Sequence, residues 1–148
     1  MSPDKKLASY IKAITGIAPS NLRIYKQVFH HRSIFIEPTK NNERLELLGD
    51  AVLDSVICDC LYRKYPCKEE GFLTELRSKI VNRKSLNELG ERLGLLDHLK
   101  LNRKSMTEVS RDLGGNTFEA LVGAVYLDAG FEKTKKFIHQ RILHSLID

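Results

Sequence analysis

Acidic side chains stand in an otherwise apolar run at residues 42–54, which reads NERLELLGDAVLD. If this run is an α-helix, Glu43, Glu46 and Asp50 lie on one stripe, because three and then four residues separate them. Carboxylates on one stripe repel one another, and each costs several kcal/mol to bury without a partner. A divalent cation with oxygen ligands relieves that cost. The alternative is an amphipathic helix whose acidic face is solvated.

A second segment, residues 116–129, is predicted to form an almost wholly apolar helix. Asn116 follows two glycines and is predicted to cap the start of this helix, and Gly130 is predicted to end it. A helix this apolar belongs in the middle of a domain. Glu119 is the one acid within its apolar core, and Asn116 lies three residues earlier on the same face.

Each of these helices carries an interior glycine, Gly49 in the first and Gly123 in the second. A glycine inside a helix costs roughly 1 kcal/mol relative to alanine, so we expect another backbone or a ligand to pass close by. A close crossing of the two helices predicts one cation site made of four oxygen ligands: Glu46, Asp50, Asn116 and Glu119. The alternative is that Glu119 pairs with a buried arginine.

The elements that must position these side chains are all predicted to be helices. Apolar residues recur at helical spacing in several further segments, and no long segment alternates at period two, so the fold class is predicted to be all-α. The predicted helices cover residues 7–16, 20–29, 42–65, 73–90, 106–111, 116–130 and 131–146.

Composition limits the classes of protein that the chain can belong to. Its 148 residues suit one domain with a real core. No apolar run is long enough to span a bilayer, and the N-terminus lacks a secretory pattern, so we expect no membrane partner and a cytoplasmic location. Three cysteines without zinc-like spacing favour reduced thiols. A net charge of +5 is mild evidence for a polyanionic partner.

The same segments carry a resemblance to a known family. The run NERLELLGDAVLD closely resembles the signature of ribonuclease III catalytic domains, and GNTFEALVGAVYLDAG resembles the second metal-binding segment of that family. The resemblance continues through residues 29–33 (FHHRS), 70–73 (EGFL) and 77–82 (RSKIVN), in the order of the family. It therefore covers essentially the whole chain and implies the helical fold of a ribonuclease III catalytic domain.

The resemblance also implies roles for the acidic residues. Glu46, Asp50 and Glu119 match metal-binding and catalytic acids of the family, and Asp50 and Glu119 are the residues we expect to be most needed for chemistry. Glu43 and Glu70 match acids that line the same valley in the dimer. His30 and His31, although histidines often act in catalysis, are expected to form a hydrogen-bonded structural turn.

The chain departs from the family pattern at two positions. Asn116 stands where the family usually has an aspartate; its carbonyl oxygen can still bind a metal, but it supplies no charge, so weaker Mg²⁺ binding is expected. Whether this residue is natural to the lineage or a later change is left open by the sequence. Leu47 stands where the family usually has a phenylalanine at the dimer interface, and leucine keeps the apolar character with less volume.

The function that the resemblance implies is Mg²⁺-dependent cleavage of double-stranded RNA by a homodimer, with Mn²⁺ as a possible substitute and no small-molecule cofactor. The products are 5′-phosphate and 3′-hydroxyl ends with staggered cuts. Residues 1–148 are expected to form a single catalytic domain without a double-stranded-RNA-binding domain, either standing alone or truncated. The alternative is a catalytically weakened domain that binds RNA or a partner and serves as a dimerisation module; Asn116 favours it.

Overall fold

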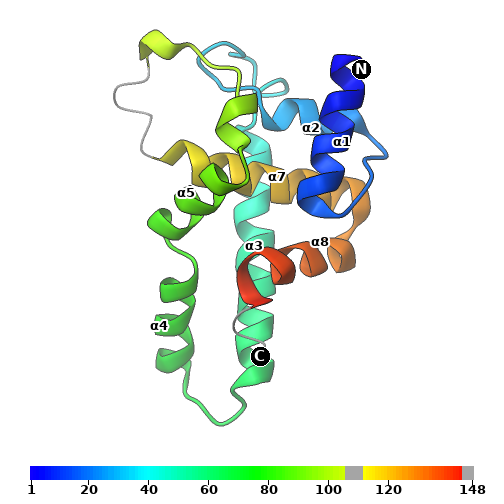
Figure 1. The fold of residues 1–148 in the computed structure, drawn as a ribbon. Helices are drawn as coiled ribbons and strands as arrows, with labels where there is room; N and C mark the ends of the chain where they lie inside the picture. Colours follow the sequence, from blue (N-terminus) through cyan, green and yellow to red (C-terminus); the bar gives the residue numbers. More distant parts are fainter. Residues whose placement is uncertain (106–111, 145–148) are drawn as a thin grey trace.

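The computed structural model describes residues 1–105 and 112–144, which form helices and no strand longer than one isolated bridge (Figure 1). The helices are α1 (Pro3–Thr15), α2 (Leu22–Val28), α3 (Glu43–Lys64), α4 (Glu70–Ile80), α5 (Arg83–Arg92), α7 (Leu113–Ala129) and α8 (Phe131–Ile138). Short 3₁₀ turns lie at Leu95–His98 and Arg103–Ser105, and a π-helical turn, His139–Leu143, follows α8. The all-α prediction is confirmed. The helix predicted at 106–111 lies outside the described residues, as does the end of the helix predicted to reach residue 146.

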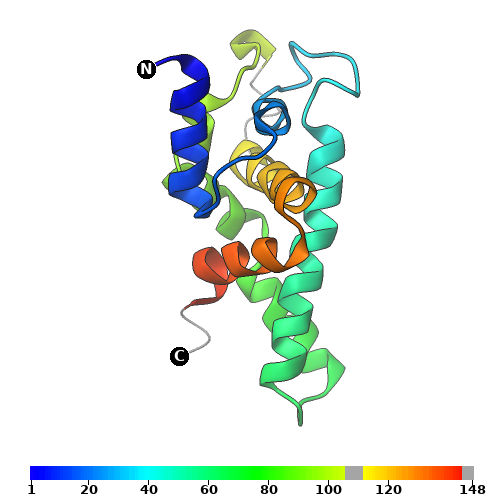
Figure 2. The ribbon, with the colours of Figure 1, turned by 90° about the vertical axis from the view of Figure 1, so that its right-hand side faces the viewer.

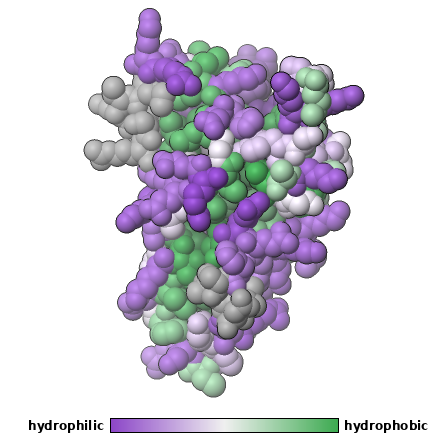
Figure 3. All heavy atoms as spheres, in the orientation of Figure 1, coloured by the Kyte–Doolittle hydropathy of each residue, from purple (hydrophilic) through white to green (hydrophobic). Residues whose placement is uncertain are grey.

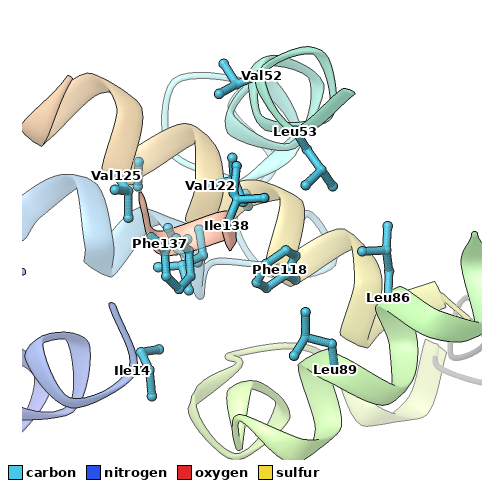
Figure 4. Close-up of a cluster of buried hydrophobic side chains, with 14 of the residues drawn as sticks. Ile14, Val52, Leu53, Leu86, Leu89, Phe118, Val122, Val125, Phe137 and Ile138 are labelled. Carbon is cyan, nitrogen blue, oxygen red and sulfur yellow. The ribbon is translucent and has the colours of Figure 1, made fainter. Parts of the chain in front are cut away.

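Helix α7 forms the centre of the molecule and crosses the upper half of α3, the long helix in Figures 1 and 2. Every residue of α7 from Leu113 to Val125 is buried except Asn116. Figure 4 shows Phe118 and Val122 of α7 among apolar side chains from α3, α5 and α8. The Phe118 and Phe137 rings lie 5.8 Å apart between centroids. The core is therefore built around the helix that the sequence predicted to be central.

The crossing of α3 and α7 brings two backbones into direct contact. A Cβ atom built on Gly49 would collide with the backbone carbonyl of Glu119, and one built on Gly123 would collide with the carbonyl of Leu45. No residue larger than glycine fits either position without moving a helix. The close approach predicted from these two interior glycines is confirmed.

Two predicted helix boundaries were wrong. The helix expected over residues 73–90 is two helices, α4 and α5, separated at Val81 and Asn82. Asn82 and Ser85 form a capping box: the Asn82 side chain accepts from the Ser85 N–H at 2.9 Å, and the Ser85 hydroxyl accepts from the Asn82 N–H at 3.0 Å. This break makes Arg83 the first residue of α5.

The start of α7 was also predicted wrongly, because Asn116 is not an N-cap. The helix begins at Leu113 and includes both glycines in its first turn. A Cβ on Gly90 of α5 would collide with the backbone of Gly114, so the glycines let α5 and α7 pack closely. The Asn87 side chain of α5 accepts from the Gly115 N–H at 2.8 Å and satisfies one N-terminal donor of α7. Asn116 therefore lies inside the helix.

Asp128, near the C-terminal end of α7, binds the start of α2 through hydrogen bonds. Its carboxylate accepts hydrogen bonds from the backbone N–H groups of Ser20 and Asn21 at 3.1 and 2.9 Å, and from the Tyr25 hydroxyl at 2.9 Å. The Asn21 side chain makes no capping bond at the start of α2, so Asp128 supplies that cap from another helix. Both ends of α7 are thus held by side-chain hydrogen bonds to neighbouring helices.

Helix α4 is packed much more loosely than α7. It contacts α3 but has no buried residue, and its Leu73, Leu76 and Ile80 are only partly covered.

Figure 3 shows apolar surface down the middle of the face seen in Figure 1, with hydrophilic side chains on both sides. Among the described residues, no helix combines the length and the apolar character needed to span a bilayer.

Candidate active site

The acidic residues predicted to act together lie where the first half of α3 meets the start of α7. A small pocket of about 120 Å³ opens between the two helices and the segment before α3. Its lining combines acidic, amide, basic and apolar side chains: His31, Arg32, Asn42, Glu43, Glu46, Leu113, Asn116 and Thr117. The crossing therefore places Glu43 and Glu46 opposite Asn116, as the glycine-marked helices predicted.

Glu119 is the buried acid of this site, with 3% of its side chain exposed. The pKa of Glu119 is raised to about 8, chiefly by burial and in addition by a hydrogen bond with Asp50 and by the charges of Asp50 and Glu46, whereas Arg83 opposes the shift. Burial likewise raises the pKa of Glu46, with Arg83 again opposing and Glu43 and Asp50 adding to it. Both shifts reflect negative charge gathered in a partly desolvated place with too little positive charge nearby.

Arg83 supplies the positive charge that the structure does place here. Its Nη1 donates to Asn116 Oδ1 at 2.9 Å and lies 3.4 Å from Glu119 Oε1. The alternative that Glu119 pairs with an arginine is thus partly realised, although the Arg83 side chain is 60% exposed and not buried. Sequence reasoning missed Arg83 because it missed the break before α5. The Asn82–Ser85 capping pair is the signal that marks Arg83 as a helix-start residue beside α7.

Glu43 and Glu70 lie at opposite ends of α3. Glu43 Oε2 lies 3.5 Å from Arg32 Nη1 on the rim of the site. Glu70 is the first residue of α4 and lies beyond the C-terminal end of α3. Helix α3 has 22 residues and is therefore about 33 Å long. The Oε1 atom of Glu70 accepts from the Thr74 hydroxyl at 2.7 Å. A single chain therefore does not bring Glu70 to the crossing where Glu46 and Glu119 meet.

The donor set of the site suits a hard divalent cation, because it consists of carboxylate and amide oxygens. The raised pKa values of Glu46 and Glu119 indicate carboxylates that lack a compensating charge. Within residues 1–105 and 112–144, however, no three His, Cys, Asp or Glu side chains are placed as a ready metal-binding group. The residues that would hold a cation are gathered, and their side chains would have to turn to share it.

The two histidines have structural surroundings. The His30 ring stacks on Phe35 with centroids 3.8 Å apart, and its Nδ1 lies 3.1 Å from the Lys40 carbonyl oxygen. His31 Nδ1 pairs with the Ser33 hydroxyl at 2.8 Å. Burial lowers the pKa of both rings, which favours their neutral forms. These contacts agree with a hydrogen-bonded turn, although His31 also borders the acidic pocket.

Leu47 is 74% exposed and lies beside the acidic stripe of α3, four residues after Glu43 and three before Asp50. It borders a groove of about 650 Å³ whose lining is largely apolar: Ile24, Gln27, Thr39, Arg44, Leu45, Leu47, Leu48, Ala51 and Leu127. Leu127, at the end of α7, is 55% exposed. An exposed apolar groove of this kind marks a surface for another molecule or another chain.

Comparison with known proteins agrees with this fold. A family model described as "Ribonuclease-III-like" matches residues 21–146. Ribonuclease 3 of Bacteroides thetaiotaomicron is 45% identical over 139 residues, covering 91% of this chain and 44% of that protein. Ribonuclease 3 of Bacteroides fragilis is 43% identical over 149 residues, covering 98% of this chain and 51% of that protein.

Solved structures give the same result. The nuclease domain of ribonuclease III from Campylobacter jejuni superposes with a TM-score of 0.81 at 29% identity, covering 95% of this chain and 96% of that one. Dicer from Pichia stipitis matches with a TM-score of 0.65 at 27% identity, over 86% of this chain and 57% of that one. The chain belongs to the ribonuclease III family, and it spans about half the length of the curated relatives that it matches.

Proposed function

We propose that this chain is the nuclease part of a Mg²⁺-dependent endoribonuclease that cleaves double-stranded RNA to 5′-phosphate and 3′-hydroxyl ends with staggered cuts. The observation that carries the proposal is Glu119, a carboxyl with 3% exposure held against Asp50 and Glu46 by a glycine crossing. A protein tolerates such crowding of acids where a cation relieves it. Membership of the ribonuclease III family supports the substrate and the chemistry. The three free cysteines agree with a cytoplasmic location.

In this proposal Glu46, Asp50 and Glu119 hold the cation, and Asn116 offers a neutral carbonyl oxygen. When bound, Mg²⁺ or Mn²⁺ would lower the pKa of water and neutralise charge developing on the phosphate. Asp50 and Glu119, which share a hydrogen bond at the crossing, are the acids most needed for chemistry in this proposal. The backbone contact at Gly49 and Gly123 keeps α3 and α7 in one register, so the acids are positioned before the substrate arrives.

We further propose that two chains form a two-fold homodimer through the groove bordered by Leu47 and Leu127. A symmetric interface should exceed about 1,000 Å² in total and be apolar at its centre. A second structure of the Campylobacter jejuni ribonuclease III nuclease domain, which matches with a TM-score of 0.77, has a flexible region that is involved in dimer formation. Dimerisation would bring Glu70 of one chain toward Glu43 of the other, which a single chain keeps apart. Two sites in one dimer would then cut both strands.

A gel assay of a long RNA duplex tests the proposal. The chain is incubated with the duplex in Mg²⁺, in Mn²⁺ and in EDTA, alongside Glu119→Gln and the surface variant Glu75→Gln. Glu75 lies on α4 in an exposed ion pair with Lys79, away from the crossing. We expect metal-dependent cleavage by the unchanged chain and by Glu75→Gln but not by Glu119→Gln. Equal cleavage in EDTA, or by all three proteins, would refute a metal-dependent site at Glu119.

Asn116 favours a second candidate function, a catalytically weakened domain that binds RNA or a partner and acts as a dimerisation module. Its amide oxygen accepts from Arg83 and carries no charge for a metal. Retention of Glu46, Asp50 and Glu119 argues against this candidate. The two functions separate in a gel-shift experiment with duplex RNA: a binding module shifts the duplex and leaves it uncut in both Mg²⁺ and Mn²⁺.

A further inference from the structure

Arg83 occupies the place at the acidic site where a cation would be needed. Its Nη1 contacts Asn116 Oδ1 at 2.9 Å and Glu119 Oε1 at 3.4 Å. Both oxygens belong to the set proposed to hold a divalent ion. A guanidinium and a divalent cation repel one another strongly at such short range, because the site is partly desolvated. They therefore cannot use the same two oxygens at once.

The contacts of Arg83 also show that it can leave. The side chain is 60% exposed and reaches the site from the first turn of α5. The capping box that fixes this turn uses Asn82 and Ser85, so it stays intact wherever the guanidinium goes. Because Glu119 is only 3% exposed, loss of Arg83 leaves its carboxylate without a counter-charge, so Arg83 leaves only when another cation takes its place.

Asn116 keeps this pairing weak. An aspartate at this position would offer Arg83 a charged acceptor with two oxygens, which can bind a guanidinium in a bidentate pair. The neutral amide lets Arg83 neutralise part of the charge of Glu119 without being locked in place. Asn116 and Arg83 therefore act as a pair, in which the first residue sets how firmly the second is held.

We propose that Arg83 is an internal counter-ion of the acidic site, held by Asn116 and Glu119 in the metal-free chain and displaced when a divalent cation binds. This inference rests on one part of the proposed function, namely that a divalent cation binds the acidic site. It assigns Asn116 a role in the metal-free chain, as the acceptor that holds Arg83. It also explains why the side chains of the proposed ligands would have to turn: they would do so when a divalent cation replaces the guanidinium.

The test is calorimetric titration of the purified chain with Mn²⁺ alone, in the absence of RNA. Arg83→Gln keeps much of the side-chain length and removes the charge, Arg83→Lys keeps the charge, and Arg92→Gln is the matched control at the exposed end of the same helix. We expect Arg83→Gln to lower the dissociation constant for Mn²⁺ by about tenfold, the lower end of neighbour effects at metal sites. Arg83→Lys and Arg92→Gln should stay close to the unchanged chain.

Thermal unfolding in EDTA gives a second measurement that does not depend on metal. Loss of the counter-ion should lower the Tm of Arg83→Gln relative to Arg92→Gln, while circular dichroism shows that both remain folded. A double-mutant cycle completes the test. Asn116→Asp should gain more Mn²⁺ affinity in the Arg83→Gln background than in the unchanged chain, because the new carboxylate no longer holds Arg83.

Failure of this inference differs from failure of the proposed function. Unchanged or weaker Mn²⁺ binding by Arg83→Gln, in a chain that still cleaves duplex RNA, would overturn the counter-ion and leave the nuclease standing. Tighter Mn²⁺ binding by Arg83→Gln, in a chain that cleaves no RNA, would support the counter-ion and count against the nuclease. Absence of Mn²⁺ binding by every variant would overturn both.

Discussion

The two sides of the first half of α3 are completed in different ways. The side facing α7 carries Glu46 and Asp50, and the same chain supplies what it needs: a buried carboxyl from α7 and a guanidinium from α5. The adjacent side carries Leu47, which is 74% exposed beside a groove of about 650 Å³. Among the described residues, nothing from the chain itself covers Leu47.

This difference shows which properties belong to one chain and which need a second molecule. Charge can be partly balanced within one chain, because Arg83 pairs with Glu119 and also acts on Glu46. Apolar surface can be removed from water only by covering its area. The acidic site should therefore assemble in an isolated chain, whereas the Leu47 groove should determine the oligomeric state. The following predictions test the two sides separately.

The largest effect is expected at Glu119. Replacing it with Gln removes a proposed ligand and a negative charge, so cleavage of duplex RNA should fall at least about a hundredfold, and more metal should not restore it. The measurement is the cleavage rate across a Mg²⁺ titration, with sedimentation on the same samples. If the variant recovers at saturating Mg²⁺, Glu119 acts only through metal affinity. If it becomes monomeric, the two sides of α3 are not independent.

A charge in the apolar groove should weaken the proposed dimer. Leu47→Asp places a carboxylate at the centre of the proposed interface, and a central residue of this kind typically contributes 2 kcal/mol or more, so the dimer dissociation constant should rise roughly thirtyfold. Tyr62→Asp is the control, because Tyr62 lies on the same helix and is also 74% exposed. Analytical ultracentrifugation at micromolar concentration distinguishes them. A variant that remains as dimeric as Tyr62→Asp would exclude Leu47 from the interface.

A smaller effect is expected at Asn116. Asn116→Asp adds a negative oxygen ligand, so cleavage at low Mg²⁺ should rise by up to about tenfold, and the gap should narrow as metal saturates the site. The comparison requires complete Mg²⁺ titration curves for both proteins. Identical curves would mean that Asn116 is not a ligand, or that this chain has compensated for the missing charge.

The smallest effect concerns the pH dependence of stability without metal. Because the pKa of Glu119 is raised from 4.5 to about 8 in the folded chain, its contribution to stability is fully present below 4.5 and is lost as the pH rises through 8. In EDTA, the Tm should therefore fall between about pH 4.5 and about pH 8 and level off above that, and the Tm of Glu119→Gln should fall less over the same range. Parallel curves for the two proteins would show that Glu119 ionises normally in the folded state.

The residues that sequence reasoning located correctly share one property: their environment is set by their own helix and by the opposing backbone. Gly49 and Gly123 predicted the crossing, because a glycine inside an apolar helix is costly unless another backbone passes close to it. Glu119 was identified as buried because the helix that carries it is almost wholly apolar. These are local signals, and they were sufficient for the all-α fold and for the place of the acidic site.

The errors arose where tertiary contacts override local signals. The apolar spacing continues from Leu76 and Ile80 to Leu86, so periodicity alone gives no break at Asn82. Gly114 and Gly115 were taken to precede a helix because glycine is a poor helix former, but close packing on α5 holds them inside α7. Arg83 depended on both errors, since its place beside Asn116 requires the break before α5 and the early start of α7.

Where α3 and α7 touch, each glycine has a hydrogen atom in place of a side chain, and this sets the distance between the two helices at the acidic site. Elsewhere in the core, a methyl group added or removed changes the packing of side chains, and the neighbours can adjust their rotamers. At Gly49 and Gly123 the neighbours are peptide groups, which have no rotamers to change. The separation of Asp50 from Glu119 is therefore insensitive to most exchanges among apolar residues, yet a single methyl group at either glycine would push the two acids apart.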